Sequence, residues 1–244
     1  MIRVCVVGAL GRMGSESVRA IEADPEMSVA LAVDKSGDVS SLPDPLTDCD
    51  VLLEFTHADS ATKHACIAAR SGVAPVIGAS GLSAAQQDEV AGACREGQVG
   101  GVLVPNFAIG AVLMMRFASE AAKWLPNAEV IEMHHDKKAD APSGTGIRTA
   151  ELIASARKKE RNPDPTQVVK FDCARGAVVE DVPVHSVRLP GLVAHQAVMF
   201  GGEGEVLTIR HDSLNRLSFM EGVKLAIRRV RDLDGFFVGL DALM

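Results

Sequence analysis

The sequence predicts an α/β fold in two parts, a parallel sheet covered by helices and an α+β domain with a mixed sheet. In the N-terminal part, short and continuously apolar runs are separated from one another by helix-like segments. Such runs are typical of strands that are buried on both faces of a parallel sheet. After Pro105 the pattern changes, and three strand-like runs later follow one another directly. Consecutive strands favour an antiparallel or mixed sheet.

Strands and helices alternate in the N-terminal part. Strands are predicted at residues 2–7, 29–33, 51–55, 73–77 and 99–104. Helices are predicted at residues 12–23, 59–70 and 84–95. Ser71-Gly72 ends the second helix, Ser83 caps the third, and Gly97 closes it.

The C-terminal part contains longer helices and the consecutive strands. Helices are predicted at residues 109–124, 144–159 and 219–230, and strands at residues 128–133, 184–189, 193–200 and 205–210. The last helix is expected to return to the first domain. One domain would then comprise residues 1–106 and 216–244, and the other residues 107–215.

The composition excludes several classes of protein. The chain has 244 residues, of which 47% are hydrophobic and 23% charged, and a net charge of -7. Because acidic chains repel polyanions, nucleic-acid and membrane partners are not expected. The five cysteines include no Cys-x-x-Cys pair, which indicates reduced thiols in a cytoplasmic protein and no zinc framework. No apolar run approaches the roughly 20 residues of a membrane span, and the N-terminus resembles a buried strand rather than a signal peptide.

The first predicted strand runs into a glycine-rich turn. Its residues are Gly8, Ala9, Leu10, Gly11, Arg12, Met13 and Gly14. Glycines let the backbone turn tightly and approach a pyrophosphate, and the N-terminus of the following helix offers N–H groups to it. Because the turn joins a strand to a helix, it predicts a Rossmann-type dinucleotide-binding domain, residues 1–106 and 216–244. A phosphate-binding loop of the Gly-Lys-Ser/Thr type is absent.

Two charged residues end the second predicted strand. Asp34 is placed to bind the ribose hydroxyls of the adenosine half. Lys35 follows directly and could accept a 2′-phosphate, so NADH and NADPH are both expected as cofactors. The alternative is a strand end that carries two solvated charges.

Two further segments follow predicted strands in the same domain. They consist of Gly78, Ala79 and Ser80 and of Val104, Pro105, Asn106 and Phe107. Ligands of open parallel sheets bind beyond the carboxyl ends of the strands, so both segments are expected to contact the nicotinamide half. Ordinary turn chemistry would explain them equally well.

The densest group of reactive side chains lies between Glu132 and Thr145. His134 is a candidate proton donor near neutral pH, and Lys138 a cation for a carboxylate. Ser143-Gly144-Thr145 begins a helix whose N–H groups could hold a second carboxylate. Together they predict a site for a small dianion in the domain of residues 107–215. A metal site is less favoured because adjacent histidines on a strand face opposite sides. The alternative without a function is a solvated charged loop.

The pattern His134-His135-x-x-Lys138-x-Asp-Ala-Pro-Ser-Gly144-Thr145 resembles the signature of the 4-hydroxy-tetrahydrodipicolinate reductase family, also called dihydrodipicolinate reductases. The loop closely resembles the version in actinobacterial members. The glycine turn, Asn106-Phe107 and the later Val-Ala-His run of residues 193–195 also agree with the family. The resemblance therefore covers much of the chain.

The resemblance implies a role for each matching position. His134 falls at the proton donor and Lys138 at a second catalytic residue, whereas His135, Gly144 and Thr145 fall at substrate-binding positions. The residues that match cofactor-binding positions of the family are the glycine turn, Asp34, Lys35 and the segments 78–80 and 104–107. The sequence departs from the family at Ala79-Ser80, where other members often have two threonines, but Ser80 keeps a hydroxyl.

The resemblance also implies an activity and an assembly. The family uses NADH or NADPH to reduce (2S,4S)-4-hydroxy-2,3,4,5-tetrahydrodipicolinate, a small dicarboxylate of lysine and diaminopimelate biosynthesis, and its members are usually homotetramers built through the substrate-domain sheet. Two other functions would keep the first domain, an amino-acid dehydrogenase such as one acting on aspartate, and a nucleotide-sensing regulator with a decayed site. The first leaves the His-His-x-x-Lys loop unexplained. The second disagrees with intact His134 and Lys138.

Overall fold

The computed structural model describes residues 1–34, 42 and 46–244. Lys35 is therefore outside the described residues, and its predicted role rests on the sequence alone. The chain divides into two compact units, one formed by Met1–Ile109 with Arg216–Met244 and the other by Gly110–Asn215. Among the described helices, none has the length and apolar character needed to cross a membrane.

The described part of the first unit contains a six-stranded sheet in the order β11-β5-β4-β3-β1-β2. Its strands are β1 (Ile2–Val7), β2 (Met27–Val33), β3 (Val51–Glu54), β4 (Ala74–Ile77), β5 (Gly101–Leu103) and β11 (Phe236–Val238). All neighbouring strands are parallel, which confirms the predicted parallel sheet. The central strands β3 and β4 are completely buried, and every residue in them is apolar except Glu54, which is bound by His64.

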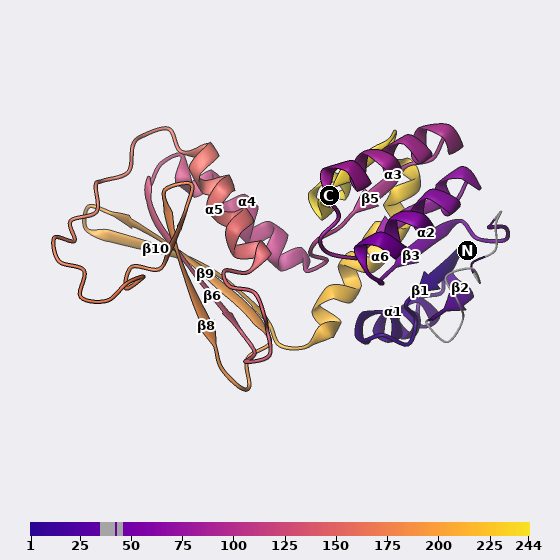
Figure 1. Ribbon diagram of the computed structural model, residues 1–244, viewed down its shortest axis with the longest axis horizontal. Coiled ribbons are helices and arrows are strands. Elements are labelled where there is room, and N and C mark those ends of the chain that lie inside the picture. The colour runs from indigo at the N-terminus through magenta and orange to yellow at the C-terminus, as the bar shows by residue number, and fades with distance from the viewer. Residues whose placement is uncertain (35–41, 43–45) are drawn as a thin grey trace. The chain divides into compact units, whose positions relative to one another are not determined.

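Four α-helices of the first unit pack beside this sheet (Figure 1). They are α1 (Arg12–Glu22), α2 (Ala58–Arg70), α3 (Ala84–Gly97) and α6 (Met220–Arg229). Helix α2 packs against α3, and α1 against α6. Ser83 caps α3 as expected, because its side chain accepts the N–H of Gln86 while the Gln86 side chain accepts the N–H of Ser83.

Two features of the first unit differ from the prediction. Gly97 is the last residue of α3, and the left-handed residue that ends the helix is Gln98, with φ of 55°. Gly97 is small for another reason, since a Cβ there would lie 1.7 Å from the carbonyl oxygen of Ala69 on α2. Strand β11 was not predicted, because it is a three-residue edge strand that is recognisable by its pairing with β5 and not by its sequence.

The second unit contains a five-stranded mixed sheet in the order β10-β9-β6-β8-β7. Its strands are β6 (Asn127–His134), β7 (Ala177–Val179), β8 (Val182–Arg188), β9 (Ala194–Gly202) and β10 (Glu205–Ser213). Strand β6 is parallel to β8 and antiparallel to β9, so it separates two strands that are consecutive in the chain. The predicted mixed sheet is confirmed, whereas β7 was not expected.

Helices α4 (Ile109–Ala122) and α5 (Gly144–Ala156) lie along the same side of this sheet (Figure 1). Helix α5 ends three residues earlier than predicted, at the extended residue Arg157. The core under the helices includes Val130, Ile153 and Phe200. Along β6, residues alternate between buried and partly exposed, so alternate side chains face the helices.

Candidate active site

The glycine turn joins β1 to α1 and leaves no space for side chains where the backbone bends. Gly8 has φ of +80°, a conformation that glycine adopts without strain. A Cβ on Gly14 would lie 2.0 Å from the Gly8 carbonyl oxygen, so the first turn of α1 passes directly over the loop. The N–H of Gly11 donates to the same carbonyl oxygen at 3.0 Å. The backbone is therefore compact at the helix N-terminus, where a pyrophosphate would approach it.

Asp34 lies against this turn. Its Oδ2 accepts the N–H of Leu10 at 2.7 Å, and the N–H groups of Gly8 and Ala9 donate to the Val33 carbonyl oxygen. The end of β2 and the glycine turn are thus held together by three hydrogen bonds. This contact brings the predicted ribose-binding carboxylate to the predicted phosphate-binding loop, which is the arrangement a dinucleotide requires.

The other predicted cofactor segments meet at the carboxyl ends of neighbouring strands. Gly78 follows β4, and a Cβ there would lie 2.3 Å from the ring of Phe55 and 2.9 Å from the ring of Phe107. The two rings contact edge to face, with centroids 5.7 Å apart. Val104 is bound to β4 through its N–H, which donates to the Ile77 carbonyl oxygen. Sequence reasoning missed Phe55, which follows β3, because a phenylalanine at a strand end has no distinguishing local pattern.

The remaining residues of these segments differ in exposure. Ala79 is buried and Ser80 exposed. Pro105 is exposed, whereas Asn106 is partly buried and accepts the N–H of Ala108 through Oδ1 at 2.9 Å. The glycine turn, Asp34 and the three strand ends fit a nicotinamide dinucleotide, because each supplies the close backbone approach or the carboxylate that such a group needs.

In the second unit, a buried carboxylate organises the predicted catalytic loop. Glu132 on β6 is 0% exposed, and its Oε2 lies 2.6 Å from Nδ1 of His134. Its Oε1 accepts the N–H of Ser143, the cap of α5, at 3.2 Å. The guanidinium of Arg188 on β8 donates to both carboxylate oxygens, at 2.9 and 2.8 Å. Glu132 thereby connects the candidate proton donor to the start of the candidate anion-binding helix.

Lys138 belongs to the same cluster through Asp140. Its Nζ lies 2.7 Å from Oδ1 of Asp140, and Arg188 donates to the Asp140 carbonyl oxygen at 2.7 Å. Arg188 therefore contacts Glu132, the partner of His134, and Asp140, the partner of Lys138. Sequence reasoning missed Arg188, which lies far along the chain, and it named Glu132 without a role.

The substrate-binding candidates surround this cluster. Ser143 caps α5 by accepting the N–H of Gly146 at 3.1 Å, and Gly144 and Thr145 form the first helical turn. Backbone N–H groups of a first turn attract anions. His135 follows β6 directly, and its Nδ1 accepts the N–H of Lys137 at 3.2 Å.

The electrostatics of the cluster follow from burial and pairing. Burial acts to raise the pKa of the Glu132 carboxyl, but hydrogen bonds from Arg188, Ser186 and His134 outweigh it, so the pKa lies below its usual value. Burial lowers the pKa of His134; Glu132 partly offsets this, and the cations Lys138 and Arg188 lower the pKa further. The hydrogen bond from Lys138 holds the pKa of Asp140 below its usual value. The arrangement is a fixed carboxylate, two cations and a histidine that releases its proton readily.

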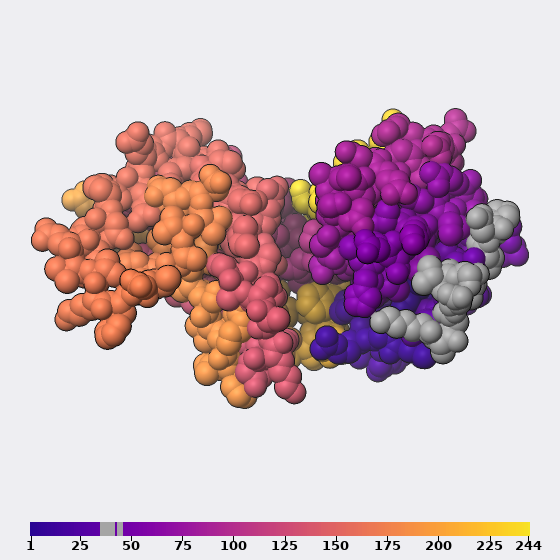
Figure 2. Space-filling model, viewed as in Figure 1, coloured from indigo at the N-terminus to yellow at the C-terminus, as the bar shows by residue number. Residues whose placement is uncertain are grey.

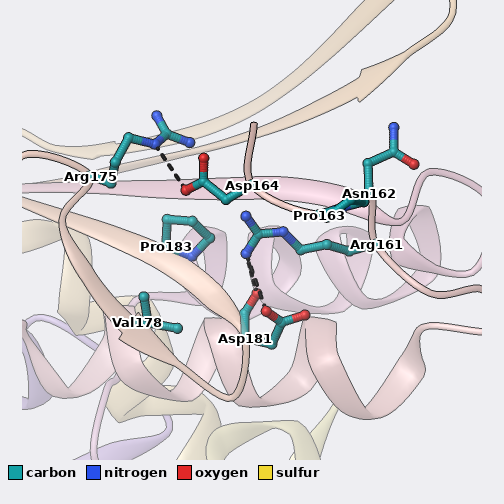
Figure 3. A pocket seen from close by; sticks show the side chains of 8 residues that line it. All are labelled: Arg161, Asn162, Pro163, Asp164, Arg175, Val178, Asp181 and Pro183. Atoms are coloured by element: carbon teal, nitrogen blue, oxygen red, sulfur yellow. Dashed lines mark hydrogen bonds and ion pairs between the residues drawn. The ribbon is translucent and has the colours of Figure 1, made fainter. Parts of the chain in front are cut away.

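A separate surface pocket of the second unit contains none of these residues (Figure 3). It is lined by residues of the exposed segment between α5 and β7, at residues 157–176 (Figure 2), and by Val178, Asp181 and Pro183. Arg161 pairs with Asp181, and Arg175 with Asp164. In the part of the chain that the structure describes, no three His, Cys, Asp or Glu side chains are grouped as metal ligands.

The chain combines a Rossmann-type unit that has a glycine turn with a histidine–lysine site at a helix N-terminus. This combination defines a nicotinamide-dependent oxidoreductase. Comparisons with known proteins narrow this class. The family models of the dihydrodipicolinate reductase N-terminus and C-terminus match residues 2–107 and 110–244. The chain therefore belongs to the dihydrodipicolinate reductase family.

Individual relatives agree over their full length. A 4-hydroxy-tetrahydrodipicolinate reductase of Moorella thermoacetica is 45% identical, with 100% of this chain and 98% of the relative covered. One of Geobacillus thermodenitrificans is 42% identical, with 100% and 99% covered. A solved dipicolinate-bound dihydrodipicolinate reductase of Paenisporosarcina sp. TG-14 has a TM-score of 0.87 and 38% identity, with both chains covered completely.

The comparisons decide between the three functions that the sequence left open. The chain is an enzyme that uses a nicotinamide cofactor to reduce 4-hydroxy-tetrahydrodipicolinate in lysine and diaminopimelate biosynthesis. A probable dehydrogenase of Thermotoga maritima, with a TM-score of 0.59 and 12% identity, shares the fold alone. The amino-acid dehydrogenase and the decayed regulator are therefore not supported.

Proposed function

We propose that His134 and Lys138 carry out the chemistry on the substrate, and that His135, Gly144 and Thr145 bind it. The observation that carries this assignment is the cluster around Glu132, which holds His134, the Lys138–Asp140 pair and the start of α5 in one network. The first unit would be the dinucleotide-binding domain, and the second the substrate-binding domain.

The substrate is a ring that carries two carboxylates, and the second unit offers a partner for each. One would be held by the N–H groups of Gly144 and Thr145, where the helix dipole is positive. The other would be held by the cations of the His135–Lys138 loop. In the family relative of known structure the bound ligand is dipicolinate, also a ring dicarboxylate, which supports this assignment.

The chemistry follows from where charge develops. Loss of the 4-hydroxyl group as water would leave a conjugated ring imine, and a nicotinamide bound in the first unit would supply the hydride that reaches C4. Negative charge that then develops on the ring needs a proton and a nearby cation. His134 would donate the proton, and Lys138 would stabilise the charge or protonate from the other side.

For the cofactor, we propose that NADH and NADPH both serve. Gly8, Ala9, Leu10, Gly11, Arg12 and Met13 would bind the pyrophosphate, and residues 78–80 and 104–107 the nicotinamide half. Asp34 would bind the ribose hydroxyls of NADH. Lys35 would supply the cation for the 2′-phosphate of NADPH, so the two cofactors would be recognised by neighbouring residues.

Replacing Lys35 with alanine is expected to raise the KM for NADPH much more than the KM for NADH, because NADPH alone carries a 2′-phosphate. The assay follows the oxidation of each cofactor, with substrate generated from pyruvate and aspartate semialdehyde by the preceding enzyme. Lys63→Ala is the matched control, since it removes an exposed lysine of α2 in the same unit. Equal changes in both KM values would rule out this role of Lys35.

We further propose a homotetramer built through the sheet face opposite α4 and α5. That face carries apolar side chains such as Ile131, Met133 and Met199, and Met199 is 39% exposed. Exposed apolar surface of this kind is typical of subunit interfaces. Light scattering is expected to give the mass of four 25.7 kDa chains, and a monomer mass at micromolar concentration would exclude this assembly.

A cytoplasmic location is proposed from the thiols. All five cysteines are free, and four of them are buried. Free thiols are typical of proteins in a reducing compartment.

A further inference from the structure

We propose that Glu132 and Arg188 are positioning residues for His134, which hold its ring so that Nε2 is the nitrogen that delivers the proton to the substrate. The proposal rests on the proposed role of His134. Glu132 precedes His134 by two residues on β6, so both side chains project from the same face of the strand. Arg188 lies directly opposite His134 on β8, where Cα pairing brings it to both residues.

The hydrogen bonds of Glu132 determine which ring nitrogen of His134 carries hydrogen. An ionised carboxylate accepts hydrogen bonds and donates none. The contact of 2.6 Å between Oε2 and Nδ1 therefore requires a hydrogen on Nδ1. In the neutral ring, Nε2 then holds a lone pair, and Nε2 carries a hydrogen in the imidazolium alone.

The proton transfer follows from this tautomer. The Nε2–H bond of the imidazolium breaks, its electron pair stays on Nε2, and the proton goes to the ring carbon that has gained charge. The neutral ring that remains keeps its Nδ1–H on Glu132 and needs no rotation. Carboxylates orient catalytic and metal-bound histidines in the same way in other enzymes.

Arg188 fixes the position of Glu132 and balances its charge. Its guanidinium binds both oxygens of Glu132 and also the Asp140 carbonyl oxygen, so one side chain fixes the supports of His134 and of Lys138. Its charge also balances that of Glu132. The charged groups around the His134 ring are Glu132 on its own strand, Lys138 in the following loop and Arg188 on β8. Burial is the main cause that holds the pKa of His134 below its usual value; Glu132 acts to raise this pKa, and the charges of Lys138 and Arg188 act to lower it.

The same strand supplies a matched control. Glu129 on β6 lies 2.8 Å from Nε2 of His185 and also pairs with Arg175. This second Glu–His–Arg group projects from the other face of β6, three residues earlier, and the proposal gives it no part in proton transfer. Glu129→Gln therefore makes the same chemical change at a site where no effect on the pH profile is expected.

The first test needs no substitution at Glu132. In protein labelled with ¹⁵N-histidine, long-range ¹H–¹⁵N correlation spectra distinguish the two neutral tautomers, and His134→Ala assigns the signal. Above its pKa, His134 is expected to be the Nδ1–H tautomer. The Nε2–H tautomer would overturn the proposal, even if His134→Ala also abolished turnover. Normal turnover of His134→Ala would instead overturn the proposed function, whatever the tautomer.

The second test is the pH profile of Glu132→Gln. Glu132 favours the imidazolium, so its loss is expected to move the descending alkaline limb of kcat/KM to lower pH and to lower kcat at neutral pH by about 10- to 100-fold. Adding the substitution to His134→Ala is expected to lower activity little further. An unmoved limb, or a full additional loss in the double variant, would show a purely structural role and overturn the proposal. Glu132→Asp is the variant to use if Glu132→Gln does not fold, since it keeps the charge but shortens the reach to Nδ1, and the expected result is a lower kcat with the limb less displaced.

Discussion

Replacing His134 with alanine is expected to lower kcat for the reduction of 4-hydroxy-tetrahydrodipicolinate by about 10²–10⁴-fold, the typical contribution of one general acid. The residue lies at the end of β6, in the second unit, whereas the glycine turn and Asp34 belong to the first. The affinity for NADH should therefore change little. Steady-state kinetics give the first quantity, and titration of NADH fluorescence gives the second.

A second histidine of the same sheet controls for damage to the fold. His185 on β8 is also held by a glutamate, Glu129, and it is 27% exposed against 16% for His134. His185→Ala should keep turnover within a few fold of the unmodified enzyme. If His134→Ala retained normal turnover, His134 would not be the proton donor. If both variants lost activity equally, the loss would come from the sheet and not from the chemistry.

Replacing Lys138 with alanine is expected to lower kcat by a similar factor of about 10²–10⁴, because a cation that meets developing charge acts mainly in the transition state. A residue that bound the substrate alone would raise KM and leave kcat unchanged. The ratio of the two effects therefore tests whether Lys138 takes part in the chemistry or only in binding. The substitution also removes the partner of the Asp140 carboxylate, whereas the Asp140 carbonyl oxygen still accepts a hydrogen bond from Arg188.

The adjacent Lys137 offers the comparison for Lys138. Lys137 is exposed, whereas the Lys138 side chain is 23% exposed and pairs with Asp140. Lys137→Ala removes one positive charge from the same loop, so it measures the general attraction of this loop for an anion. A loss of kcat in Lys138→Ala that Lys137→Ala reproduced would contradict a specific role for Lys138.

Local patterns were sufficient to predict the fold class and the family. The glycine turn could be recognised because Gly8, Gly11 and Gly14 act within one strand–turn–helix segment. The parallel sheet could be predicted because each strand is a continuous apolar run. The apolar composition of such a run is enough to indicate burial on both faces. The loop of His134 and Lys138 carried a pattern long enough to identify the family, and the comparisons confirm it.

The parts that could not be predicted depend on which strands become neighbours. Arg188 reaches Glu132 because β8 pairs with β6, and nothing near either residue in the sequence indicates that pairing. Phe55 meets Gly78 because β3 and β4 end at the same edge. Gly97 was predicted to close α3, but its small size serves a contact with another helix. In each case the role of the residue depends on a contact with a residue that is distant in the sequence.

The alternation of side chains along β6 also limits how this chain can change in length. Glu132 and His134 face the helices, while Glu129 and Ile131 project from the opposite face. Because the side-chain period of a strand is two residues, inserting or deleting one residue within β6 would exchange these faces for every residue beyond it. A single event would then place the proton donor and its carboxylate on the face of the sheet opposite the helices. Changes in length should be found instead in the exposed segment of residues 157–176, and β6 should keep a constant length as the sequence drifts.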